Sequence, residues 1–179
     1  MPYIHYYHSP IGVLKITAEE GYITGLSLCI EEIVTSANTP EASCLCTPLL
    51  QQTCHQLAEY FAGERTRFTI PIKYTTGTPF QHSVWNALRE IPYGETRSYA
   101  DIAVAIGNPK AVRAIGQANH NNPMLLLVSC HRVINKNGSI GGFGCGVEVK
   151  KQLLQLERTK SSARISGRAF CFAKQRRIP

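Results

Sequence analysis

The sequence predicts an α/β protein with a small N-terminal α/β domain followed by a mostly helical domain that contains a helix-turn-helix. The first third of the chain carries short β-prone runs and then one segment with helical spacing. The second half carries four helical segments broken by Gly, Pro and Asn. Hydrophobic residues make up 44% of the 179 residues and charged residues 17%, which is enough to bury a core.

Three short strands are predicted at the beginning of the chain. β-Prone residues fill Tyr3–His8, Val13–Ala18 and Ile23–Cys29, and turn-forming residues stand between these runs. Connections this short join antiparallel strands. We therefore expect an antiparallel sheet.

One helix is expected to complete the first domain. A loop rich in Ser, Thr and Pro covers Thr35–Pro48, and Leu49–Ala62 then shows apolar residues at helical spacing. The helix should end at Gly63, because Gly adopts the left-handed conformation that closes a helix. The first domain is thus predicted over residues 1–72, followed by a linker at 73–78.

The second domain is predicted over residues 79–157 and begins with a helix. Thr78 is a helix-capping residue type, and Pro79–Glu90 places apolar residues along one face. The turn-forming segment 92–96 follows it. The last helix of the domain is predicted at Val147–Glu157, after a cluster of glycines.

A helix-turn-helix is predicted between these two helices. Ser98 is expected to cap a short helix that ends at Ile106. Asn108 is expected to cap the next helix, Lys110–Asn119, with Pro109 at its first position. In DNA-binding proteins with this motif, the second helix lies against the nucleic acid.

The second helix of this motif has two distinct faces. Val112 and Ile115 are expected to face the core, whereas Lys110, Arg113 and Gln117 fall on another face. Ala and Gly fill most of the remaining positions, so the helix can approach a nucleic-acid backbone closely. An ordinary Ala-rich packing helix is the alternative interpretation.

The excess positive charge lies at the C-terminal end. Residues 1–157 carry twelve Lys and Arg against twelve Asp and Glu, whereas the tail, residues 158–179, carries seven basic residues and no acidic one. Such a tail favours polyanions, because binding releases their counterions. A solvated, poorly ordered terminus is the alternative interpretation.

The chemistry is expected at Cys130. The apolar run Leu125–Ser129 is predicted as a strand that ends in Cys130, His131 and Arg132. A cysteine reacts as the thiolate, and an adjacent base and positive charge raise the ionised fraction above that of an ordinary thiol, whose pKa is about 8.5. Because neighbours on a strand point to opposite sides, the His should reach the thiol through a water or a bend. On its own, the pattern also fits a buried structural cysteine.

Composition excludes several classes of protein. No apolar run is long enough to span a membrane, and residues 1–10 lack the basic and apolar regions of a secretory signal. Seven cysteines without framework spacing indicate free thiols in a reducing cytoplasm. Cys44, Cys46, Cys54 and His55 match no zinc spacing, so we expect no bound metal and no cofactor.

Several separate motifs of the second half match one known family, in order. They are Gly77–Gln81, Ile91–Thr96, Ser98–Tyr99, Gly107–Pro109, Arg113–Gly116, Asn122–Pro123, Cys130–Val133, and Lys150 with Leu153, Leu154 and Glu157. Through them the chain resembles the O6-alkylguanine-DNA alkyltransferase family, the methylated-DNA–protein-cysteine methyltransferases. The N-terminal third matches more loosely, through the strand pattern and residues 61–63.

The resemblance implies a ribonuclease-H-like N-terminal domain and a DNA-repair activity. The alkyl group of O6-alkylguanine, with O4-alkylthymine left open, would pass irreversibly to Cys130, so that one protein repairs one lesion. His131 looks like the base that deprotonates the thiol through a water, and Glu157 like the carboxylate that orients this His. Tyr99 is similar to the tyrosine whose phenol lets guanine leave as a neutral base.

The resemblance also implies a base pocket next to the thiol. The carbonyls of Cys130 and Val133 are expected to bind the guanine amino group, and the amide of Gly144 to face O6. Asn122 resembles the asparagine that joins the helix-turn-helix to the active site.

The implied partner is double-stranded DNA, approached from the minor groove by a monomer. Arg113 resembles the arginine that fills the gap in the base stack after the lesion is flipped out. Lys110 and Gln117 are expected to add DNA contacts from the same helix.

The chain departs from the family pattern at three positions near the thiol. Ser129 stands where proline is usual, and Phe143 where tyrosine is common. Cys145 replaces a frequent glycine, either as a passive substitution or as a redox partner of Cys130.

The residues also argue against three alternative functions. A non-catalytic lesion sensor of the same fold would lack the cysteine, which is present here. A cysteine hydrolase would need a distant His and Asn or Asp around a helix-borne Cys. A plain helix-turn-helix regulator would not need the cysteine cluster at all.

Overall fold

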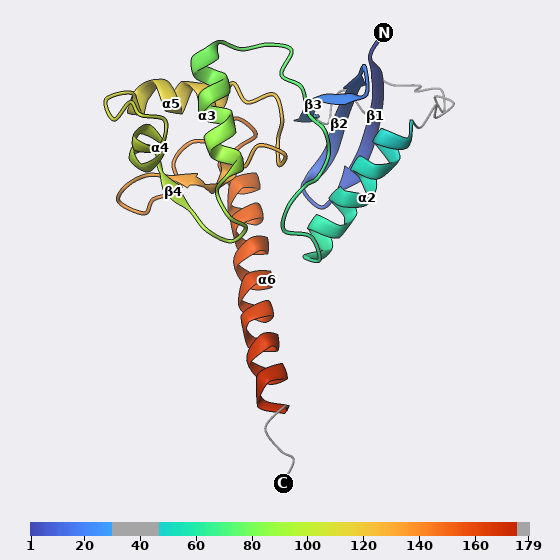
Figure 1. Ribbon diagram of the computed structural model, residues 1–179, viewed down its shortest axis with the longest axis vertical. Coiled ribbons are helices and arrows are strands. Elements are labelled where there is room, and N and C mark those ends of the chain that lie inside the picture. Colours follow the sequence, from blue (N-terminus) through green and yellow to red (C-terminus); the bar gives the residue numbers. More distant parts are fainter. Residues whose placement is uncertain (30–46, 175–179) are drawn as a thin grey trace.

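The computed structural model describes residues 1–29 and 47–174, with side chains as far as residue 162. A three-stranded antiparallel sheet with one helix beside it forms the N-terminal domain, and the rest of the chain is mostly helical (Figure 1). The predicted fold class is confirmed. Most of the predicted loop Thr35–Pro48 lies outside the described residues. None of the described helices is long and apolar enough to cross a membrane.

The sheet consists of β1 (Tyr3–Ser9), β2 (Gly12–Glu19) and β3 (Tyr22–Leu28), in that order. Both pairings are antiparallel, as predicted. Alternate residues of β2, such as Leu14 and Ile16, are fully buried. This period of two places one face of the sheet in the core.

The helix α2 (Pro48–Ala62) packs against β1 and β2. It begins after Thr47, whose Oγ1 accepts a hydrogen bond from the amide of Leu50 (3.3 Å). It ends at Gly63, which has a φ of 77° and closes the helix in the left-handed conformation. The predicted end is therefore confirmed.

The edge of β3 opposite β2 is hydrogen-bonded to the end of the N-terminal domain and to the segment that precedes Cys130. The amide of Ile23 donates to Pro71 O (2.9 Å), and the amide of Leu26 donates to Pro123 O (2.9 Å). The amide of Leu125 donates back to Leu26 O (2.8 Å). The N-terminal sheet therefore supports the segment that leads to the reactive cysteine.

The helical domain begins with α3 (Pro79–Arg89). Thr78 and Gln81 cap it reciprocally, each side chain accepting a hydrogen bond from the other residue's backbone amide. The indole of Trp85 is buried and donates to Ala118 O (2.8 Å), which joins α3 to the second helix of the helix-turn-helix.

The first helix of that motif, α4 (Tyr99–Ala105), has a similar cap. Ser98 Oγ accepts from the amide of Asp101 (3.1 Å), and the Asp101 carboxylate accepts from the amide of Ser98 (2.7 Å). Just before it, β4 (Arg97–Ser98) pairs in parallel with β5 (Val133–Ile134). This short pairing fixes α4 next to the reactive segment.

The predicted start of the second helix was wrong. The helix α5 (Val112–His120) begins two residues after Lys110. The preceding residues form a turn in which the amide of Ala111 donates to Asn108 O (3.0 Å). Pro109 fits the second position of such a turn as well as the first position of a helix, so its presence did not distinguish the two.

The core-facing side of α5 also differs from the prediction. Ile115 is buried as expected, but Val112 is 39% exposed. Ala118 and Asn119 complete the buried face instead. Val112 lies at the start of the helix, one turn before the packed residues.

The predicted strand Leu125–Ser129 is absent. Leu126 has a φ of 68°, and the amide of Val128 donates to Met124 O (2.9 Å), so the chain turns back on itself. Residues Cys130–Arg132 then form a single 3-10 turn. An unbroken apolar run has no period, and a buried irregular loop gives the same pattern as a buried strand.

The last helix, α6 (Val147–Lys174), extends far beyond its predicted end, so most of the basic tail is helical. Figure 1 shows it projecting from the body, away from α5. Its middle passes close to two glycines: Lys160 lies against Gly63, and Ser161 lies against Gly94. A Cβ at either glycine would collide with α6, so this close approach requires glycine.

Candidate active site

The thiol of Cys130 is enclosed by the irregular loop that precedes it. Cys130 is 4% exposed, and Asn122 Nδ2 donates to its sulfur (3.1 Å) and to Val128 O (3.1 Å). Asn122 Oδ1 accepts from the amide of Met124 (2.9 Å). One amide side chain therefore holds both the loop and the thiol.

A buried acid–base pair joins His131 of the 3-10 turn to Glu157 of α6. His131 Nε2 lies 2.8 Å from Glu157 Oε1, and both side chains are almost completely buried. Because Nε2 donates to the carboxylate, Nδ1 carries the lone pair when the ring is neutral. Nδ1 is buried and has no hydrogen-bond partner among the described residues. It is thus available to accept a proton.

Glu157 receives hydrogen bonds from four residues, which lie in three parts of the chain. Besides His131, the guanidinium of Arg132 donates to both carboxylate oxygens (2.9 Å each), Tyr60 Oη donates to Oε1 (2.7 Å), and the amide of Gly94 donates to Oε2 (2.9 Å). Burial raises the pKa of Glu157, but the hydrogen bonds from His131 and Arg132 and the charge of Arg132 outweigh this and hold it well below its usual range. The carboxylate stays ionised.

The His131 ring is neutral near pH 7. Burial lowers its pKa, and this exceeds the opposite influence of the Glu157 carboxylate. A neutral ring is the form that a general base requires.

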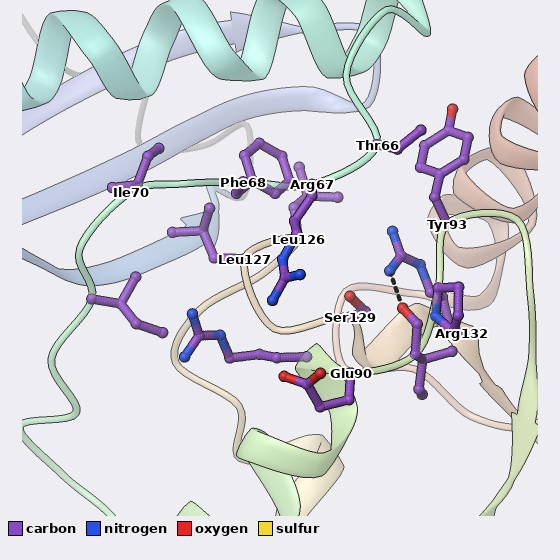
Figure 2. A pocket seen from close by; sticks show the side chains of 14 residues that line it. Thr66, Arg67, Phe68, Ile70, Glu90, Tyr93, Leu126, Leu127, Ser129 and Arg132 are labelled. Atoms are coloured by element: carbon purple, nitrogen blue, oxygen red, sulfur yellow. Dashed lines mark hydrogen bonds between the residues drawn. The ribbon is translucent and has the colours of Figure 1, made fainter.

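Arg132 does not face the thiol, contrary to the prediction. Its guanidinium is bound to Glu157 and donates to Ile91 O (2.6 Å), and it lies 5.7 Å from the centre of the Tyr93 ring (Figure 2). The charge of Arg132 is therefore neutralised by Glu157. Although Arg132 is close to Cys130 in the sequence, the fold directs its guanidinium to Glu157 instead.

A second buried cation, Lys150, lies near enough to Cys130 for the two side chains to influence each other's pKa; the sequence predicted its place in a family motif but not this role. Lys150 is fully buried, donates to Gly142 O (3.3 Å) and lies 5.9 Å from the Phe143 ring. Burial lowers its pKa to about 8, and the charge of Cys130 acts in the opposite direction. Its place on the same helical face as Leu153 was the signal, because a lysine in an apolar stripe is unusual.

The resting thiol is protonated. Burial raises the pKa of Cys130 to about 11, although the hydrogen bond from Asn122 and the charge of Lys150 lower it, while Cys145 adds to the increase. The resting site therefore does not show the raised thiolate fraction of Cys130 that the sequence predicts. The proton has to be removed by a base during the reaction.

A cavity of 350 Å³, in the range of small-ligand sites, is lined by residues of α4, of α5 and of the segment 142–144. Tyr99 and Gly144 line it, and so does Asn119, whose Nδ2 donates to Cys130 O (3.3 Å). Burial raises the pKa of Tyr99, so its phenol remains a donor. Val133 is buried in β5 and is not part of the cavity wall.

Three predicted DNA contacts lie on the outer surface of the helix-turn-helix. Lys110, Arg113 and Gln117 are exposed, and Lys110 belongs to the turn before α5. Two apolar side chains are exposed on the same motif, Val104 at 68% and Val112 at 39%.

A second hollow, of 430 Å³, lies on the other side of the cysteine loop. Figure 2 shows that Ser129 and Arg132 line it together with Arg67 and Phe68 from the N-terminal domain. Cys130 is absent from the walls of both cavities, but the 350 Å³ cavity includes Asn119, which donates to Cys130 O, and is therefore the better candidate for the reaction site.

The described residues contain no group of three or more potential metal ligands. Cys54 and His55 lie on α2, and Cys44 and Cys46 lie outside the described residues. The described cysteines Cys29, Cys54, Cys130 and Cys145 are all free thiols.

Two family models match the chain. Residues 3–74 match the ribonuclease-like domain of 6-O-methylguanine DNA methyltransferase, and residues 79–159 match its DNA binding domain. The constitutive methylated-DNA–protein-cysteine methyltransferase of Bacillus subtilis is 51% identical over 155 residues, 84% of this chain and 92% of the relative. The same-named protein of Methanosarcina acetivorans is 41% identical over 87% of this chain and 97% of the relative.

Solved structures agree. The crystal structure of Mycobacterium tuberculosis O6-methylguanine methyltransferase superposes with a TM-score of 0.75 at 40% identity, covering 89% of this chain and 94% of that one. The M. tuberculosis protein in complex with DNA gives a TM-score of 0.74 at 40% identity, over 87% of this chain and 92% of that one. The chain therefore belongs to the 6-O-methylguanine DNA methyltransferase family.

Proposed function

We propose that the protein repairs DNA by transferring the alkyl group of O6-alkylguanine to Cys130, once per molecule. The observation that carries this proposal is the buried thiol of Cys130, held by Asn122 and followed directly by the His131–Glu157 pair. The matched relatives are named for this reaction, and one of them has been crystallised with DNA.

The reaction forms an S–C bond and breaks the bond between the alkyl carbon and O6. Because the thiol is protonated at rest, His131 Nδ1 takes its proton, through a water, as sulfur attacks. Lys150 stabilises the developing thiolate. The electron pair of the broken bond goes to guanine, and Tyr99 donates its phenolic proton so that guanine leaves as the neutral base. The proton that His131 has taken then returns through solvent to the Tyr99 phenolate. The thioether has no leaving group, so nothing regenerates Cys130.

The 350 Å³ cavity is the proposed site for the flipped base. Gly144 in its wall supports the predicted contact between the Gly144 amide and O6. The predicted contacts to the guanine amino group use Cys130 O, which already accepts from Asn119 Nδ2 (3.3 Å), and the carbonyl of Val133.

The proposed partner is double-stranded DNA, bound by a monomer through the minor groove. The exposed positions of Lys110, Arg113 and Gln117 support this arrangement. In it, Arg113 would enter the base stack in place of the lesion. The division into residues 1–72, 73–78 and 79–157 remains our prediction for the domain boundaries.

The test is the intact mass of the protein after incubation with duplex DNA that contains O6-methylguanine. We expect a gain of one methylene mass on the peptide that carries Cys130, no gain for Cys130→Ala, and a normal gain for the matched variant Cys145→Ala. Tight lesion binding by the wild type without any mass gain would reject the proposal and favour the lesion sensor.

A further inference from the structure

We propose that Tyr60, on α2 of the N-terminal domain, is a positioning residue for alkyl transfer, because its hydrogen bond to Glu157 keeps His131 a neutral proton acceptor. This inference rests on the proposed function. It makes the N-terminal domain part of the active site, although the reactive cysteine and its base both lie in the helical domain.

The contact joins residues that are far apart in the sequence. Tyr60 Oη donates to Glu157 Oε1 at 2.7 Å, across 97 positions, and both side chains are 1% exposed. The same oxygen, Oε1, lies 2.8 Å from His131 Nε2. Tyr60 and His131 therefore share one acceptor atom.

The phenol is held in place by its surroundings. The Tyr60 ring packs edge-on against Phe61 (5.3 Å between ring centres) and Tyr93 (5.9 Å), and it is tilted against Phe68 (5.4 Å). Behind it, Gly63 ends α2 where Lys160 of α6 passes in contact. Because the ring packs on three aromatic side chains, the hydroxyl has little freedom to leave the carboxylate.

Because Tyr60 donates to the same carboxylate oxygen as His131, Glu157 stabilises the protonated form of His131 less strongly. Each hydrogen bond to a carboxylate oxygen stabilises its negative charge and makes it a poorer partner for a cation. Without the Tyr60 donor, Glu157 would stabilise the protonated form of His131 more strongly, and the pKa of His131 would rise. A protonated ring cannot accept the proton of the thiol.

Tyr60 itself acts only as a donor. Burial, and next the negative charge of Glu157, raise its pKa well above the ordinary tyrosine value. The other titratable or charged groups near His131, Glu157 and Tyr60 are Arg132, Lys150, Tyr93 and Cys130. The substitution Tyr60→Phe alters none of these four residues.

The experiment measures single-turnover alkyl transfer to Cys130 as a function of pH for the full chain. In Tyr60→Phe, we expect the acidic limb of the profile to move upward by about 0.5–1 pH unit, with a rate close to wild type at high pH. An NMR titration of His131 should show the same upward shift. Tyr74→Phe is the matched control, because it removes a half-buried hydroxyl that donates to Asn86 (3.3 Å) and does not contact Glu157.

A lower melting temperature of Tyr60→Phe with an unchanged pH profile and His131 titration would overturn the proposal and leave Tyr60 a purely structural residue. The same shift in Tyr74→Phe would also overturn it, because the effect would not depend on Glu157. Failure of the proposed function is distinguishable, since the wild type would then transfer no alkyl group at any pH.

Discussion

The candidate active site and the proposed DNA-contacting surface of this protein are built on opposite principles. Around Glu157, charges are buried, paired and joined by hydrogen bonds that connect both domains. On the helix-turn-helix, Arg113 and Lys110 are exposed and bind no described acidic side chain.

This difference predicts which substitutions affect the stability of the fold and which affect only the recognition of DNA. A buried ion pair is costly to break, because removing one partner leaves an unpaired charge, whereas an exposed charge can be removed with little effect on folding. We therefore expect substitutions at the buried network to change both stability and chemistry. Substitutions on the exposed surface should change only the reaction with DNA.

The largest effect is expected for Glu157→Gln. The change leaves Arg132, which is 5% exposed, without its counter-charge, so the free energy of unfolding should fall by about 3 kcal/mol and alkyl transfer should slow at least tenfold. Urea denaturation and single-turnover kinetics measure the two losses. The control is Glu148→Gln on the same helix, where an exposed carboxylate pairs with Lys151.

The pH dependence of stability sharpens this prediction. The pKa of Glu157 is lower in the folded than in the unfolded chain, so its contribution is present above the unfolded value of about 4.3 and is lost as the pH falls below it. Unfolding midpoints of wild type and Glu157→Gln should therefore converge on acidification. A constant difference between them down to pH 3 would contradict the assigned ionisation.

The substitution Lys150→Met should change stability and the rate of alkyl transfer in opposite directions. The pKa of Lys150 is about 8, below its unfolded value, so its charge destabilises the fold at neutral pH and this cost is relieved as the pH rises through 8 to about 10.4. The variant should gain about 1 kcal/mol of stability at pH 7 and yet transfer the alkyl group roughly tenfold more slowly. Lys151→Met, next to it but half-exposed, is the control. An unchanged transfer rate would exclude Lys150 from thiolate stabilisation.

Much of the fold could be predicted because its signals are local. The capping residues Thr78 and Ser98, the glycine after α2 and the alternation in β2 each act within a few positions. The predictions were wrong where one local sequence pattern fits two different structures. Pro109 fits a turn or a helix start, and the apolar run before Cys130 fits a strand or a buried loop.

The site was predictable only in part, for the same reason. The resemblance named Cys130, His131 and Glu157. In the structure, His131 lies on the same turn as Cys130 and contacts Glu157. The contact of Tyr60 with Glu157 crosses both domains and leaves no spacing to detect. Burial, which raises the pKa of the thiol instead of lowering it, is likewise a property of the packed molecule.

On the exposed surface, Arg113→Ala should slow repair of duplex DNA about tenfold, because nothing then fills the gap left by the flipped base. Its melting temperature should equal that of the wild type. Reaction with free O6-benzylguanine, which needs no flipping, should be unaffected. The exposed Lys136, outside the helix-turn-helix, provides the control variant Lys136→Ala. Equal slowing with both substrates would make Arg113 a structural residue.

The smallest effect is expected from the tail, which carries charge but projects away from α5 (Figure 1). Truncation should be made after Ser162, because Lys160 and Ser161 pack against Gly63 and Gly94. It removes Arg164, Arg168, Lys174, Arg176 and Arg177. Each lost phosphate contact lowers the log–log salt slope of DNA binding by about 0.9, and we expect a loss of about one unit, since most of the helix points away from the DNA-facing surface. The melting temperature and reaction with the free base should not change. A variant with Gln at positions 164 and 168 keeps the helix length and tests charge alone, and equal salt slopes for all three proteins would make the tail a passive extension.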